Sequence, residues 1–83
     1  MKSIRAAIVH LSARKVSDWR SRQRSLDYRT RRDRNLLSRA LEAAEDEIDG
    51  ASEFVNSLSG NEMAWLLEDI AEAVERRLQS GNR

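Results

Sequence analysis

The residues that could support catalysis are few and scattered in this chain of 83 residues. His10 is the single histidine, no cysteine occurs, and none of the ten serines stands in a nucleophile or phosphate-loop motif. The acidic residues between positions 42 and 49 have no histidine or cysteine ligands among them and lack the spaced Asp and Gly residues of a calcium loop. We therefore expect no enzymatic activity, no metal site and no cofactor, and we expect His10 to be solvated.

Recognition chemistry has a stronger candidate in the stretch KVSDWRSRQRSLDYRTRRDRN, residues 15–35, in which eight residues are Lys or Arg. Three of its arginines would line one edge of a helix and neutralise phosphates, namely Arg20, Arg24 and Arg31. Trp19 and Tyr28 could stack on unpaired bases. The same charge would also suit the acidic half of this chain or of a second copy, an acidic partner protein, or a membrane surface. The sequence leaves these interpretations open, and the membrane ranks last.

The charge of the chain is divided sharply between its two parts. Residues 1–34 contain eleven Lys or Arg and three Asp, a net charge of +8, whereas residues 35–83 contain four Arg and eleven acidic residues, a net charge of −7. Within the acidic part, pairs such as Glu42 and Asp46 stand four apart on a predicted helix, where they repel each other. We favour the basic segment, from this chain or from a second copy, as the group that offsets this repulsion.

The pattern of apolar residues predicts an all-α fold. Pro is absent, Gly occurs three times, and no run of β-branched residues suggests a strand. We predict a single domain of two or three helices, with a basic helix at about 4–26 and an antiparallel hairpin of helices at about 34–58 and 62–79, followed by a flexible tail at 80–83. Ser3 is an expected N-cap, and Thr30 and Asp33 are both plausible N-caps for the helix that follows.

The segment 34–58 has the clearest periodicity. Its apolar residues recur at alternating spacings of four and three, as in a coiled-coil seam: Leu37, Leu41, Ala44, Ile48, Ala51, Val55 and Leu58. Gly50 interrupts the segment, but the unbroken heptad phase favours one continuous or gently kinked helix over a turn at Asp49 and Gly50. A short chain without disulfides has a marginal core, so we predict a homodimer. Its interface is predicted at Leu37, Leu41, Ile48, Phe54 and Val55.

The helix at 62–79 carries a capping box, formed by Ser59 and Glu62. Its apolar stripe is predicted at Met63, Leu66, Leu67, Ile70, Val74 and Leu78. Trp65 lies off this stripe, on the same side of the helix as Asp69. It is therefore either covered by the basic helix, from its own or a second chain, or available to a partner. Trp19 falls instead on the apolar face of the basic helix, which favours packing over base stacking.

These features predict a small non-enzymatic helical protein that binds another protein and modulates it, most simply as an inhibitor. In its size, its lack of Cys and Pro, and its charge, the chain resembles small accessory proteins of bacteriophages and mobile elements, which act by binding a host protein. The partner-binding residues are predicted to be Trp65, Asp69, Trp19, Arg20, Arg24 and Arg31. The alternative is a DNA- or RNA-binding regulator that uses residues 14–34. No apolar run reaches the ~20 residues of a membrane span, and the lack of Cys fits a cytoplasmic location.

Overall fold

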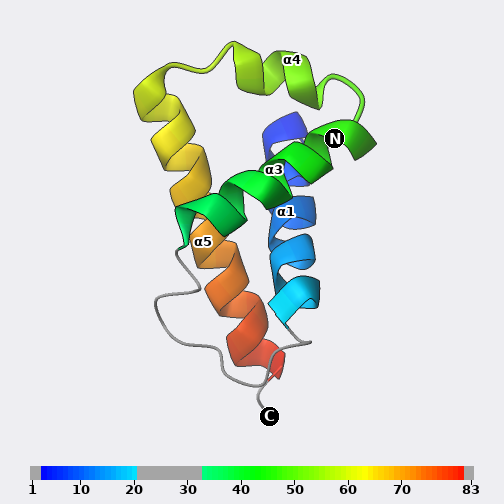
Figure 1. The fold of residues 1–83 in the computed structure, drawn as a ribbon, viewed down its shortest axis with the longest axis vertical. Coiled ribbons are helices and arrows are strands. Elements are labelled where there is room, and N and C mark those ends of the chain that lie inside the picture. The colour runs from blue at the N-terminus through cyan, green and yellow to red at the C-terminus, as the bar shows by residue number, and fades with distance from the viewer. Residues whose placement is uncertain (1–2, 21–32, 82–83) are drawn as a thin grey trace.

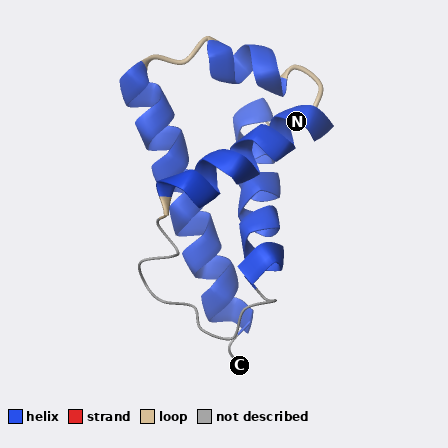
Figure 2. Ribbon diagram, viewed as in Figure 1, coloured by secondary structure: helices blue, strands red, loops and turns tan. Residues whose placement is uncertain are grey.

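The described residues of the computed structural model, 3–20 and 33–81, are helical apart from short connections (Figure 2). Four helices follow one another along the chain: α1 (Ile4–Arg20), α3 (Arg34–Glu47), α4 (Ala51–Asn56) and α5 (Gly60–Gly81). No strand occurs among these residues. The prediction of an all-α fold is confirmed.

Helix α1 is the central element of the fold. Figure 1 shows α1 and α5 side by side and running in the same direction, with α3 crossing in front of both and α4 spanning one end. The most extensive contacts between elements join α1 to α5 and α1 to α3. The fully buried side chains of α1, which include Ile8 and Val16, belong to one core cluster with residues of both neighbours.

The predicted antiparallel hairpin of helices 34–58 and 62–79 is not what the structure shows. Helix α3 meets α5 near its own first turn, where Arg34 and Leu37 line a small cleft together with residues from the middle of α5: Ala64, Leu67, Glu68 and Ala71. Beyond that point α3 diverges from α5 and crosses α1 (Figure 1). The physical reason is that α1 supplies a third apolar face, and α3 and α5 both bury their stripes against it.

The predicted continuous helix at 34–58 is broken. Helix α3 ends at Glu47, Ile48 is extended with φ −113° and ψ 120°, and Gly50 takes a left-handed conformation with φ +83° before α4 begins at Ala51. A Cβ atom disfavours the left-handed conformation, and glycine has none. Gly50 therefore permits a turn here, which the heptad pattern did not predict. After the turn Ala51 and Val55 still reach the core, but on a separate short helix.

The expected N-cap at Ser3 is confirmed, and Asp33, one of the two candidates for the next helix, caps α3; Thr30, the other candidate, lies outside the described residues. The Ser3 hydroxyl accepts a hydrogen bond from the Ala6 N–H at 3.1 Å, and the Asp33 carboxylate accepts from the Asn35 N–H at 3.0 Å. The capping box also forms, because the Ser59 N–H donates to Glu62 Oε1 at 2.9 Å and the Glu62 N–H donates to Ser59 Oγ at 3.2 Å. Each cap satisfies backbone donors that a helix start leaves unpaired, so these boundaries follow from local chemistry.

The core lies where α1, α3 and α5 meet. It is formed mainly by large aliphatic side chains that are buried in the single chain: Ile8, Val16, Leu37, Leu41, Val55, Leu66, Ile70 and Val74. Leu58 and Met63, the predicted hydrophobic staple beside the capping box, pack against its edge. On α1, the hydroxyl oxygens of Ser12 and Ser17 are both enclosed and have no hydrogen-bond partner among the described residues, and Ser12 is completely buried.

Candidate interaction surface

Metal-binding groups are not assembled in the part of the chain that the structure describes. His10 is exposed on α1, as expected. Within residues 3–20 and 33–81, no group of three or more His, Asp or Glu residues is placed to hold a metal ion. Over the same residues, no helix combines the length and hydropathy that crossing a membrane requires. What remains to be explained is the surface of the bundle, and above all its two tryptophans.

Trp65 is the most conspicuous apolar side chain on this surface, with 63% of its area exposed. It lies in the second turn of α5, whose next residue, Leu66, is completely buried. Successive residues on a helix are about 100° apart, so an indole beside a core leucine faces sideways rather than inward. No described helix of the chain covers it. The interpretation that α1 of the same chain packs over Trp65 is therefore wrong.

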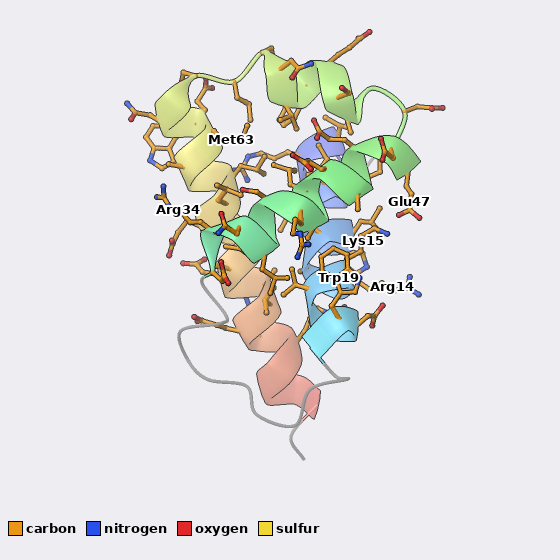
Figure 3. The ribbon with its side chains drawn as sticks, in the orientation of Figure 1. Arg14, Lys15, Trp19, Arg34, Glu47 and Met63 are labelled. Atoms are coloured by element: carbon orange, nitrogen blue, oxygen red, sulfur yellow. The ribbon has the colours of Figure 1, made fainter. Side chains whose placement is uncertain are left out.

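Trp19, near the end of α1, is 38% exposed. The sequence placed it on the apolar face, and the structure shows that this face only partly shelters the indole. Figure 3 shows Trp19 close to Lys15 on the same helix. The arginines predicted to act with it cannot be placed beside it: the Arg20 side chain, Arg24 and Arg31 lie outside the described residues.

The basic and acidic parts of the chain meet at two ion pairs among the described residues. Arg5 on α1 pairs with Asp69 on α5 at 2.5 Å. Lys15 on α1 pairs with Glu47 on α3 at 2.8 Å (Figure 3). Asp69, predicted to bind a partner, is thus already engaged by Arg5. Both pairs are partly exposed, so each contributes about 1 kcal/mol or less to stability, and they join α1 to both of its neighbours.

Glu45, within the acidic cluster of α3, has electrostatically unfavourable surroundings. Partial burial raises the pKa of Glu45, and the neighbouring carboxylates of Glu42 and Asp46 raise it further. By contrast, the capping box lowers the pKa of Glu62, because the Ser59 N–H and then the Ser59 hydroxyl stabilise its carboxylate. Repulsion within this cluster thus acts on Glu45 through Glu42 and Asp46, and the Lys15–Glu47 pair places one positive charge at the end of the helix.

A groove runs between α1 and α5 and was not predicted from the sequence. It has a volume of about 480 Å³. Small apolar residues form its floor: Ala6, Val9, Ala13 and Ala73. Charged or polar residues form its rim: Arg5, His10, Asp69, Arg76 and Arg77. No described residue of α3 or α4 lines it, so it opens on the face of the α1–α5 pair away from α3. The available sequence signal was the set of alanines flanking the aliphatic stripes.

The residues predicted to form a dimer interface are used inside the chain. Leu37, Leu41 and Val55 have 3%, 5% and 6% of their surface exposed, so they have almost no area to offer to a second copy. Ile48 and Phe54 are half-buried and pack against the same core. The apolar face predicted at residues 34–58 therefore exists, but it packs against α1 of the same chain. A homodimer stays a prediction, and it would need another surface.

Comparison of the chain with family models, curated proteins and solved structures finds no match. The described residues themselves define the class: an all-helical bundle with its own aliphatic core, an exposed indole on α5 and a groove between α1 and α5. Its function has to be argued from that surface.

Proposed function

We propose that this chain is a non-enzymatic helical protein that binds another protein and modulates it. The observation that supports this most directly is the 63% exposure of Trp65. Tryptophan carries a large apolar surface, and it is among the residues most enriched at the energetic centres of protein interfaces. A partner that covers this indole would recover the free energy lost by leaving it in water.

The bundle does not need Trp65 for its own core. Leu66, Ile70 and Val74 fill the inner face of α5 and are completely buried, while Trp65 stands outside that stripe. Asp69, four residues further on, shares its flank of the helix and is held by Arg5. An exposed indole next to a positioned ion pair offers an apolar contact and a polar contact on one rigid helix. We propose modulation by occupancy, in which the bound bundle blocks a surface of its partner and so inhibits it.

The test is capture of the partner from the native host with the full chain and with Trp65→Ala. We expect Trp65→Ala to keep its helical circular dichroism and to lose capture by at least about tenfold, as for a hot-spot residue. Arg39→Ala is the control, because it removes an exposed side chain on α3 that is not among the predicted partner-binding residues. Equal capture by Trp65→Ala and the unchanged chain would refute a binding role for this surface. Unfolding of Trp65→Ala would show that the indole is structural.

A second candidate function is DNA or RNA binding through residues 14–34. The observation that favours it is the exposure of Trp19 to 38%, because an exposed ring at the end of a basic helix can stack on a base. Gel shifts over a series of salt concentrations would test it. This candidate predicts affinity that falls steeply with salt and is lost when Arg20, Arg24 and Arg31 are all replaced by Glu. Binding that depends neither on salt concentration nor on these three arginines would exclude this second candidate function.

A further inference from the structure

We infer that the α1–α5 groove binds an amphipathic helix of a partner protein whose flanking residues are acidic. This inference rests on the proposed function, and it adds where the partner lies and what its chemistry is. Three observations support it: the small size of the residues on the floor of the groove, the positive charge of its rim, and the burial of the apolar stripe of α3, which leaves a second copy of this chain without a helix to place in the groove.

The floor of the groove suits a helix. Ala6, Ala13 and Ala73 are small, and Val9 lies among them. Helices approach each other more closely where the side chains at their contact are small. The volume of about 480 Å³ leaves room for side chains from an incoming helix. Helix-in-groove binding uses apolar anchors spaced three and four residues apart, and an apolar floor between two helices provides the matching surface.

The rim of the groove is basic. It carries Arg5, Arg76 and Arg77 against a single carboxylate, Asp69, which is paired with Arg5. Arg76 and Arg77 are exposed, and neither forms an ion pair with the described part of the chain. His10 adds a further polar group on the α1 side. Glu72 is exposed nearby on α5 but does not line the groove. Acidic residues beside the anchors of the partner helix would complement this rim.

A second copy of this chain fits the groove poorly. A two-fold interface places the same patch on both sides, so it would set Arg76 and Arg77 against their own counterparts. The acidic helix α3 of a second copy would match the charge, but its apolar stripe is buried in its own core: Leu37, Ala40, Leu41 and Ala44. An occupant must bring both acidic residues and free apolar anchors, and the described residues of this chain offer no such helix.

Trp65 extends this surface along α5. It lies four residues before Asp69 on the same flank, which is about 6 Å along the helix axis. From Trp65 to Arg77 the surface spans ~18 Å, the length of a helix of about twelve residues. A partner helix of three or four turns would therefore contact the indole at one end and the two arginines at the other, with its apolar anchors on the alanine floor.

The probes that test this inference are two synthetic helical peptides of about sixteen residues, long enough to cover the surface. Both carry leucines at spacings of four and three on one face, and they differ only in having Glu or Lys on the flanks. Binding is measured by fluorescence anisotropy, and the contact surface is mapped by amide chemical shifts on the full chain. We expect the Glu-flanked peptide to bind at least about tenfold more tightly than the Lys-flanked one, with shifts along α1 and α5.

Two variants should change this binding in different ways. Arg76→Glu with Arg77→Glu should weaken the Glu-flanked peptide by about tenfold or more and strengthen the Lys-flanked one, because the rim charge is reversed. Ala6→Leu places a larger side chain on the floor at an exposed position and should weaken both peptides by about fivefold. Arg39→Glu is the control, because it reverses an exposed charge on α3 outside the groove.

Several results would overturn the inference. These are equal affinity for the two peptides, shifts confined to α3 and α4, or no effect of the Arg76 and Arg77 reversal. A DNA duplex that binds more tightly than the Glu-flanked peptide and needs the same arginines would also overturn it, in favour of nucleic acid. The proposed function fails separately, when Trp65→Ala captures the partner as well as the unchanged chain does. Loss of capture by Trp65→Ala without peptide discrimination leaves that function standing and removes the groove.

Discussion

The two sides of the α1–α5 pair differ in the residues that line them and in whether another helix covers them. On one side α3 crosses both helices, and the contact is made by large aliphatic residues such as Ile8, Leu41 and Ile70. On the other side the same two helices present alanines, a valine and a charged rim, and no described helix covers them. Large side chains thus close one face and small ones leave a groove on the other. The difference suggests that the first face serves stability and the second serves recognition.

The largest expected effect contrasts two residues of α5 on these two sides. Ile70→Ala should lower the free energy of unfolding by about 2–5 kcal/mol, because Ile70 is completely buried and its truncation leaves a cavity in the core. Trp65→Ala should change it by less than about 0.5 kcal/mol, since the indole is mostly solvated. Urea denaturation followed by circular dichroism measures both values.

The same experiment tests whether the closed side is complete within one chain. A self-contained core predicts an unfolding midpoint that does not depend on protein concentration, whereas a homodimer predicts one that rises with it. Similar losses for Ile70→Ala and Trp65→Ala would contradict the division of the α1–α5 pair into a stabilising and a recognising side.

The turn at Gly50 separates α3 from α4, and substitution of Gly50 tests this break. With φ at +83°, Gly50→Ala should destabilise the chain by about 1–2 kcal/mol, and the added Cβ would also stand 3.3 Å from Ile4 Cδ1. In a continuous helix the same change would stabilise the chain by about 1 kcal/mol. The sign of the change in thermal unfolding free energy therefore distinguishes the two structures. Asn at this position is the milder control, because it tolerates the left-handed conformation better than Ala does.

Ser12 places a polar hydroxyl on the buried face of α1. Its hydroxyl is completely enclosed and has no hydrogen-bond partner among the described residues. Ser12→Ala should therefore raise the free energy of unfolding by about 1 kcal/mol, through the loss of a desolvation cost and a gain in helix propensity. Ser38→Ala, on α3 and only half-buried, is the control for propensity alone. A loss of stability in Ser12→Ala would show that the hydroxyl is satisfied in solution.

The smallest effects concern pH and compare two glutamates. The pKa of Glu62 is lowered from about 4.5, so its contribution to stability is present above that pH and is lost as the pH falls through the lowered pKa. The pKa of Glu45 is raised, so ionisation costs stability as the pH rises through about 4.5 and above. Glu62→Gln should thus weaken the chain at neutral pH but hardly at about pH 3, and Glu45→Gln should strengthen it at neutral pH. Urea titrations at both pH values measure this, and identical pH profiles for the two variants would contradict it.

Local features of the fold could be predicted because their causes are local. The Ser59–Glu62 capping box and the Asp33 cap depend on side chains within three residues of the backbone groups they satisfy. The buried stripe of α5 follows from helical periodicity, as does the outward position of Trp65. The groove could not be predicted in the same way, because it exists only where alanines of α1 and α5 are brought opposite each other.

The sequence by itself determined the helical class, the caps of α1, α3 and α5 and the faces that are apolar, because propensity, capping and periodicity act over a few residues. The tertiary structure decided which apolar face meets which: α1, rather than a second copy, covers the seam of α3, and Gly50 ends that seam with a turn. Periodicity marks a face for burial but carries no information about its partner. That choice depends on how all the helices pack together, and it left the α1–α5 groove and Trp65 on the surface.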